Sequence, residues 1–419
     1  MTSECFVYVM LPRTISFVTA GKIVLSTDRY GIATGRFVYG RSYLALADAV
    51  PLDPIELPLS ERTYETTRLK GMFGALRDAS PDYWGRRVIE RHAGFAQLGE
   101  IDYMLHSPDD RAGALGFGLN VEPPAPLRTY NRTVDLARLQ TLADQLIAQE
   151  ATSDEQAELQ QVEDLLLLGT SMGGARPKAV VEDDGHLWIA KFNRQDDPFN
   201  HARVEHAMLV LARECGLSAA DSRITRIAGR DVLLVKRFDR QPLQEGYCRA
   251  RMLSALTLLR TGDSYQDRER WSYVLLAEEL RRLSHRPRAD AHELFKRMTF
   301  NALISNTDDH PRNHAVIALD GEYHLSPAYD LTPFPLLSKE RRDLALTVGG
   351  LGRYANAANL VSQAARFLLE REAATRIVDE MEAQVRAHWY RIARREGVSE
   401  RDCEKIARAF VYEGFRQPA

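Results

Sequence analysis

The chain has 419 residues, 45% hydrophobic and 27% charged, an ordinary balance for a globular protein, and its length predicts two or three packed units. The formal net charge of −3 gives no general basis for binding nucleic acid or membranes, although a local basic patch remains open. Four dispersed cysteines without a C-x-x-C pair argue against a disulfide framework and a thiolate zinc site. Since no apolar run approaches the roughly 20 residues of a membrane helix, and the N-terminus resembles a strand rather than a signal peptide, we expect a cytoplasmic protein.

The first part of the chain, residues 1 to about 120, has the pattern of short strands and turns followed by one helical stretch. The proline cluster VEPPAPL, Val121 to Leu127, predicts a boundary. We therefore expect domains over 1–125, 126–240 and 241–419. An amphipathic helix should follow the first boundary, with Thr133 as its N-cap.

The middle of the chain predicts strands around one helix. Asp184-Gly185 is a hairpin turn signal within EDDGHLWIAKF, and SRITRIAGRDVLLVKRFDR predicts a second strand pair. Between them, NHARVEHAMLVLARECG predicts a helix with Asn200 as N-cap and Gly216 as its stop.

Beyond about Gln241 the pattern is mostly helical. One helix should start at Asp290, with Glu293 completing a capping box. The last sixty residues predict helices with a break near Gly397.

Two features of the middle region could bind phosphate. SMGGARPK, Ser171 to Lys178, has adjacent glycines that let backbone amides approach an anion, although such a loop alone is more often structural. Lys191 ends the strand LWIAK and could reach phosphates, or it is an ordinary strand-end lysine. Glu205 lies on the next predicted helix, and a strand lysine paired with a helix glutamate is how protein kinases hold nucleotide phosphates.

The polar stretch NTDDHPRNH, Asn306 to His314, follows a predicted helix. Its Asp308 and Asn313 have the spacing of the kinase catalytic loop, H-R-D-x-x-x-x-N. That chemistry needs a carboxylate to deprotonate the attacking hydroxyl and an amide oxygen on Mg²⁺. AVIALDGEYHLSP then predicts a hairpin that returns Asp330 to the loop as a second metal ligand.

A zinc site is the main alternative for this stretch, because His310 and His314 have i,i+4 spacing. Pro311 disfavours the helical conformation at His310 that this geometry needs. A zinc or two-metal hydrolase and a purely structural turn stay open as minor alternatives.

Five passages together carry a family resemblance: SMGGARPKA, LLVKRFDR, FNALISNTDDHPRNHAVI, LSPAYDLTP and GALRDASPDYWGRR (Gly74 to Arg87). The chain resembles the HipA family of serine/threonine kinases, the toxins of bacterial HipA/HipB toxin–antitoxin pairs. The resemblance implies an α+β, kinase-like bilobal fold with an N-terminal β-rich subdomain, a mixed N-lobe and a mainly helical C-lobe. ATP and Mg²⁺ would lie in the cleft between the lobes.

The resemblance also implies residue roles. Asp308 would be the catalytic base, and Asn313 and Asp330 would hold Mg²⁺. Ser171 matches a serine whose autophosphorylation silences family members, since a dianion there competes with ATP for the loop amides. Asp309 stands where a small residue is common and would add negative charge beside the metal. The implied nucleotide contacts are Gly173, Gly174, Ala175, Arg176, Pro177, Lys178, Lys191, the hinge Lys236, Arg237 and Phe238, then His310, Pro311, Arg312, Asn313, Tyr329 and Asp330.

The expected function is ATP-dependent phosphorylation of a serine or threonine on a protein, such as an aminoacyl-tRNA synthetase, which would arrest growth. The expected partner is a HipB-like helix-turn-helix antitoxin, with DNA contacted only through it. Two alternatives remain: a small-molecule phosphotransferase on a kinase-like fold, and a non-catalytic co-repressor partner of a DNA-binding antitoxin.

Overall fold

The computed structural model describes residues 2–83, 85, 86, 89, 90, 98–126, 130–148, 176–335 and 338–417. The chain forms two compact units. Unit 1 contains Met1–Phe192, Arg237–Leu253 and Ile317–Gly321, and unit 2 contains Asn193–Lys236, Ser254–Val316 and Glu322–Ala419. Within the described ranges, no helix has both the length and the apolar character needed to cross a membrane.

Unit 1 begins with an antiparallel sheet of five strands in the order β4-β3-β2-β1-β5. Its strands are β1 (Thr2–Met10), β2 (Phe17–Thr27), β3 (Ala33–Tyr39), β4 (Tyr64–Thr66) and β5 (Leu115–Gly118). Alternate residues of β3 are buried, as the two-residue period of a strand requires, and Phe37 and Tyr39 enter the core with Val7 and Ile23. The strand-rich start that the sequence predicts is confirmed.

The rest of unit 1 adds short helices and two hairpins. The helices are α1 (Arg41–Leu44), η1 (Arg68–Lys70), α2 (Gly74–Asp78), α4 (Glu100–His106), η2 (Thr133–Asp135) and α5 (Leu136–Ala148). The strands are β6 (Asn131–Arg132), β7 (Lys178–Asp183), β8 (His186–Phe192), β11 (Arg240–Leu243) and β12 (Gly246–Arg249).

The predicted hairpin turn and the predicted helix cap of unit 1 have different outcomes. The hairpin turn between β7 and β8 is confirmed, since Asp184 and Gly185 both have positive φ, 48° and 67°. Thr133 is not the N-cap that was predicted. It is the first residue of η2, because Arg132 is the cap and its amide donates to Asp135 Oδ2 at 2.8 Å.

Unit 2 is mainly helical. Its helices are α7 (His201–Glu214), α8 (Ala255–Leu258), η4 (Tyr265–Arg270), α9 (Tyr273–Leu283), α10 (Pro287–Leu303), η5 (Pro311–Asn313), α11 (Ala357–Ser362), η6 (Ala364–Phe367), α12 (Arg371–Arg395), α13 (Glu400–Ile406), η7 (Ala407–Ala409) and η8 (Glu413–Arg416). Its strands are β9 (Ser222–Ile227), the antiparallel β10 (Arg230–Lys236) and β15 (His324–Leu325). β13 (Arg251–Ser254) and β14 (Ala315–Ala318) run through points where the chain passes from one unit to the other.

The helix boundaries of unit 2 follow their signals with one exception. Asn200 caps α7 by accepting from the Arg203 amide at 3.2 Å, and Gly216 follows the helix with φ +75°. α10 was expected to start at Asp290, but it starts one turn earlier at Pro287, a residue suited to the first helical turn. Asp290 instead accepts from Ser284 Oγ and the Leu325 amide, which removes it from capping.

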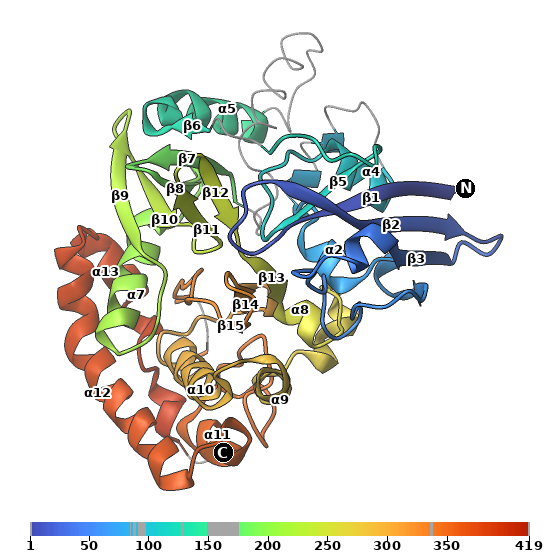
Figure 1. The fold of residues 1–419 in the computed structure, drawn as a ribbon. Coiled ribbons are helices and arrows are strands. Elements are labelled where there is room, and N and C mark those ends of the chain that lie inside the picture. Colours follow the sequence, from blue (N-terminus) through green and yellow to red (C-terminus); the bar gives the residue numbers. More distant parts are fainter. Residues whose placement is uncertain are drawn as a thin grey trace. The chain divides into compact units, whose positions relative to one another are not determined.

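α10 is the central helix of unit 2. It packs against α9 and α12 (Figure 1), and its buried face includes Leu294, Phe295 and Met298. The break predicted near Gly397 separates α12 from α13, and this glycine has φ +82°. The buried end of α10 leads directly into the polar stretch that begins at Asn306.

Candidate active site

The polar stretch after α10 is a compact loop. Ser305 has φ +53° and turns the chain out of the helix. The His310 amide donates to Asp308 O at 2.8 Å, and the Asn313 amide donates to His310 O at 2.9 Å. His310 is extended, with φ −88° and ψ 167°, as Pro311 requires. The helical geometry that would place His310 and His314 on one face is therefore not formed.

Asp308 is the solvent-exposed carboxylate of this loop. Partial burial raises its pKa above the ordinary range, nearby His310 opposes that rise, and the negative charges of Asp330 and Asp309 add to it. The hairpin of β14 and β15 returns Asp330 to the loop. Asn306 Nδ2 also donates to the backbone oxygen of Asp330 at 3.4 Å.

The loop carries oxygen atoms that could bind Mg²⁺. The side chain of Asn313 is nearly buried, and its Nδ2 donates to Asp308 O at 3.3 Å, so its Oδ1 is the atom left to bind a cation. The carboxylates of Asp308 and Asp330 repel each other, and a bound cation would relieve that repulsion. Carboxylate and amide oxygens are the hard ligands that Mg²⁺ prefers. The residues therefore fit the predicted metal.

Arg312 and Tyr329 hold the loop to its surroundings. Tyr329 donates its hydroxyl to Arg312 O at 2.6 Å, and the Arg312 guanidinium pairs with Asp263 at 2.6 Å. The charge of Arg312 is thus already balanced within unit 2. Sequence reasoning missed Asp263, which lies 49 residues before its partner and has no local signal.

Asp309, which was expected to add negative charge beside the metal, points away from solvent. Its side chain is 1% exposed and turned to the interior. It accepts hydrogen bonds from Tyr273 Oη and from His314 Nε2, the latter at 2.8 Å. Its negative charge also raises the pKa of Asp308, and a role beside a metal stays a prediction.

Unit 1 carries the two lysines of the predicted phosphate site. Lys178 begins β7 and stands opposite Lys191 of β8. The Lys178 ammonium is buried and donates to Asp82 Oδ2 at 2.9 Å, whereas Lys191 is half-buried. Asp82 belongs to the passage GALRDASPDYWGRR, so two of the five passages meet in one ion pair. The Lys178 charge is therefore balanced by Asp82, which was not expected.

The predicted hinge residues differ in what their side chains can do. The Arg237 side chain is 0% exposed and pairs with Asp110 and Asp239, so only its backbone could make the predicted hinge contact. Burial alone would lower its pKa, but these two carboxylates raise it above the ordinary value. The amides of Lys236 and Arg237 already donate to protein carbonyls, and Phe238 is half-buried.

The remaining predicted residues include four that the structure does not describe. Ser171, Gly173, Gly174 and Ala175 lie outside the described residues. Arg176 is half-buried, and Pro177 is buried and accepts from the Phe192 amide at 3.2 Å. Glu205 is 6% exposed on α7.

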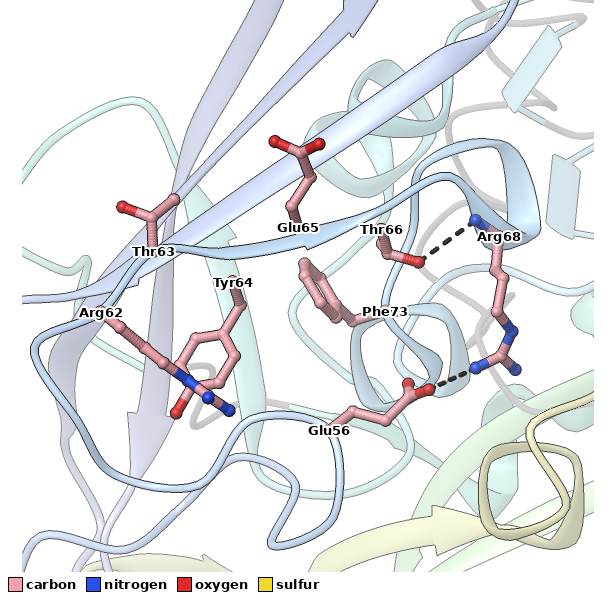
Figure 2. A pocket seen from close by; sticks show the side chains of 8 residues that line it. All are labelled: Glu56, Arg62, Thr63, Tyr64, Glu65, Thr66, Arg68 and Phe73. Carbon is pink, nitrogen blue, oxygen red and sulfur yellow. Dashed lines mark hydrogen bonds and ion pairs between the residues drawn. The ribbon is translucent and has the colours of Figure 1, made fainter.

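A surface pocket of about 470 Å³ lies elsewhere in unit 1, at edge strand β4 (Figure 2). Its wall includes the ion pair between Arg68 and Glu56 and the ring of Tyr64 beneath the Arg62 guanidinium. None of the residues predicted from the sequence for the active site lines it. It is therefore a separate feature of the N-terminal sheet.

Comparisons with known proteins place both parts of the chain. Residues 170–389 match the HipA-like C-terminal domain, and residues 16–118 match the HipA N-terminal domain. Two relatives bear the name "Putative kinase". The one from Sinorhizobium fredii is 24% identical over 81% of this chain and 82% of its own length. The one from Haemophilus influenzae is 25% identical over 43% of this chain and 62% of its own length.

Among solved structures, the chain is similar to HipA of Shewanella oneidensis, determined as a toxin–antitoxin complex with HipB and operator DNA. The TM-score is 0.68 at 16% identity, over 95% of this chain and 94% of that chain. This similarity confirms the predicted α+β, kinase-like fold. Because the HipA-like C-terminal domain alone matches more than half of the residues and the N-terminal domain matches as well, the chain belongs to the HipA family.

Proposed function

We propose that this protein is an ATP- and Mg²⁺-dependent kinase that phosphorylates a serine or threonine hydroxyl of a protein substrate. The observation that carries the proposal is the grouping of Asp308, Asn313 and Asp330 in unit 2. An exposed carboxylate with a raised pKa lies on the same loop as an amide oxygen, and a second carboxylate is close enough to repel it. The names of the relatives and the HipA family match support a phosphotransferase.

Asp308 would act as the general base. Its carboxylate would accept the proton of the substrate hydroxyl as that oxygen bonds to the γ-phosphorus and the bond to the ADP oxygen breaks. A raised pKa suits this role, because a carboxylate that is a stronger base takes the proton more readily. The hydrogen bond from Asn313 Nδ2 to Asp308 O orients the amide relative to the base.

Asn313 and Asp330 would hold Mg²⁺, which would neutralise charge on the phosphates. The family resemblance implies Lys191 as a phosphate contact and Phe238 as an adenine contact, and both belong to this proposal. Catalysis would then consist mainly of positioning and charge stabilisation.

The family match supports a toxin of a toxin–antitoxin pair, with a HipB-like antitoxin as partner. The related HipA of Shewanella oneidensis was solved with HipB and operator DNA. We propose the same kind of partner here, with DNA contacted only through it. An aminoacyl-tRNA synthetase as the substrate and Ser171 as a site of autophosphorylation also belong to this proposal.

The proposal is tested with ATP labelled on the γ-phosphate, Mg²⁺ and candidate protein substrates. The wild type should yield phosphoserine or phosphothreonine, whereas Asp308→Asn should form it at least about 10²-fold more slowly. Asp320→Asn is the matched control, because Asp320 is an exposed aspartate at the turn of the same hairpin and pairs only with Arg13 among the described contacts. Label found solely on small molecules, or equal protein labelling by Asp308→Asn, would overturn the proposal.

A further inference from the structure

Five polar side chains are buried in and around the polar loop of residues 305–314. Each is at most 2% exposed: Tyr273, Asn301, Asn306, Asp309 and His314. Burying a polar group costs free energy unless it is hydrogen-bonded. Apolar residues could fill the same volume without that cost, so the grouping needs another explanation.

The five side chains form one continuous chain of hydrogen bonds. Asn306 Nδ2 donates to the backbone oxygen of Asp330 at 3.4 Å and to Asn301 Oδ1 at 3.1 Å. Asn301 Nδ2 donates to Tyr273 Oη at 3.4 Å, and Tyr273 Oη donates to Asp309 Oδ2. His314 Nε2 reaches the same carboxylate oxygen at 2.8 Å.

Asp309 determines which groups donate in this series of hydrogen bonds. An ionised carboxylate only accepts hydrogen bonds, so both the Tyr273 hydroxyl and His314 Nε2 must donate to it. Burial and the charge of Asp309 raise the pKa of Tyr273, which keeps the proton on its hydroxyl. His314 Nδ1 has no hydrogen-bond partner within the described residues, so the contact of Nε2 with Asp309 is the hydrogen bond that orients the ring.

These hydrogen bonds reach the proposed active site at three residues. Asp309 directly follows the proposed base Asp308, and His314 directly follows Asn313. At the other end, Asn306 holds the backbone of Asp330, whose φ of +60° is unfavourable for a residue other than glycine. Such a backbone conformation persists only where the surroundings hold it.

We propose that the Tyr273–Asp309–His314 contact, extended by Asn301 and Asn306, is a positioning network that fixes Asp308 and Asp330 relative to each other. Its members are buried from solvent and act through their neighbours, so they are positioning residues. The inference rests on the proposed kinase function. Connected buried hydrogen bonds restrict their side chains to one arrangement, and the proposed reaction needs such fixed geometry.

Tyr273→Phe is the sharpest test, because it removes one hydroxyl and keeps the ring. We expect kcat to fall about 10- to 100-fold, as for other changes in residues that orient metal ligands. The KM for ATP should stay within about twofold, since the substrate contacts remain. Tyr43→Phe is the matched control in unit 1, where a 1% exposed tyrosine donates to Val50 O at 2.6 Å. It should leave kcat unchanged.

Asp309 provides a graded second test. Tyr273 and His314 contact the same oxygen of Asp309, and Asp309→Asn keeps an oxygen there but removes the charge, so we expect a partial loss of kcat. Asp309→Leu removes every acceptor and should cost more. Equal losses in the two variants would contradict a hydrogen-bonded role.

Amide hydrogen exchange over residues 305–314 separates this inference from the proposed function, because it needs no activity. Tyr273→Phe and Asp309→Leu should speed exchange there, and Tyr43→Phe should not. If the wild type transfers no phosphate, the proposed function fails while the exchange result still tests the network. Wild-type exchange in the loop of Tyr273→Phe, with or without a lower melting temperature, would overturn the inference.

Discussion

Two regions of the molecule each bury a cluster of polar side chains. The two clusters differ in whether an exposed reactive group lies next to them. In unit 1, Arg237 and Arg240 pair with Asp110 and Asp239, and all four side chains are at most 5% exposed. In unit 2, the network around Asp309 lies behind Asp308, which reaches solvent. The first arrangement satisfies its charges internally, and the second ends beside a carboxylate that is left available. Buried polarity therefore marks a site only where it supports an exposed reactive group.

The largest expected effect is in unit 2. Asp330→Ala removes a proposed Mg²⁺ ligand from a loop outside the apolar core, so transfer should fall by about 10³-fold or more, as when a major charge-stabilising group is lost. The melting temperature should change little. Transfer rates and thermal melts measured on the same preparation check this, and a variant that unfolds would show that Asp330 is structural.

Unit 1 should respond in the opposite way. Asp110→Asn leaves Arg237 buried with one carboxylate fewer, and breaking a buried pair in this way should cost about 3 kcal/mol of unfolding free energy. Denaturant unfolding measures the cost. Transfer per folded molecule should be unchanged, and a specific loss of kcat would erase the contrast between the two regions.

A smaller effect concerns pH and the N-terminal sheet. Burial raises the pKa of Asp53 to about 6, and hydrogen bonds from the Ile55 and Glu56 amides oppose that rise. Because the folded pKa exceeds the unfolded one, the folded state binds more protons between about pH 4 and 6, and stability falls as pH rises through that window. Asp53→Asn should remove about 2 to 3 kcal/mol of that pH dependence. Unfolding curves at pH 4 and 7 check it, and an unchanged pH dependence in Asp53→Asn would contradict the assignment.

Sequence reasoning succeeded where the signals are local. Pro311 gave the extended conformation of His310, Asp320-Gly321 gave the hairpin that returns Asp330, and Asn200 gave the start of α7. These features depend on neighbouring residues, whose conformational preferences are readable in the chain.

What the sequence could not provide are pairings between distant residues. Lys178 and Asp82 are 96 residues apart, and Arg237 and Asp110 are 127 apart. Asp309 turned inward because Tyr273, 36 residues away, offers it a buried donor. Which charged side chain faces a ligand and which faces a protein partner is decided by such contacts, and no spacing rule reports them.

The role of Asp308 as the general base is tested most directly by one paired measurement. This is the single-turnover rate of phosphoryl transfer per folded molecule in Asp308→Asn and in Asp110→Asn. Asp308→Asn should melt like the wild type and bind ATP, yet its transfer should be about 10²- to 10⁴-fold slower, the contribution of a general base. Asp110→Asn should be less stable and transfer at the wild-type rate. A rate for Asp308→Asn within a few-fold of wild type would contradict its role as the base.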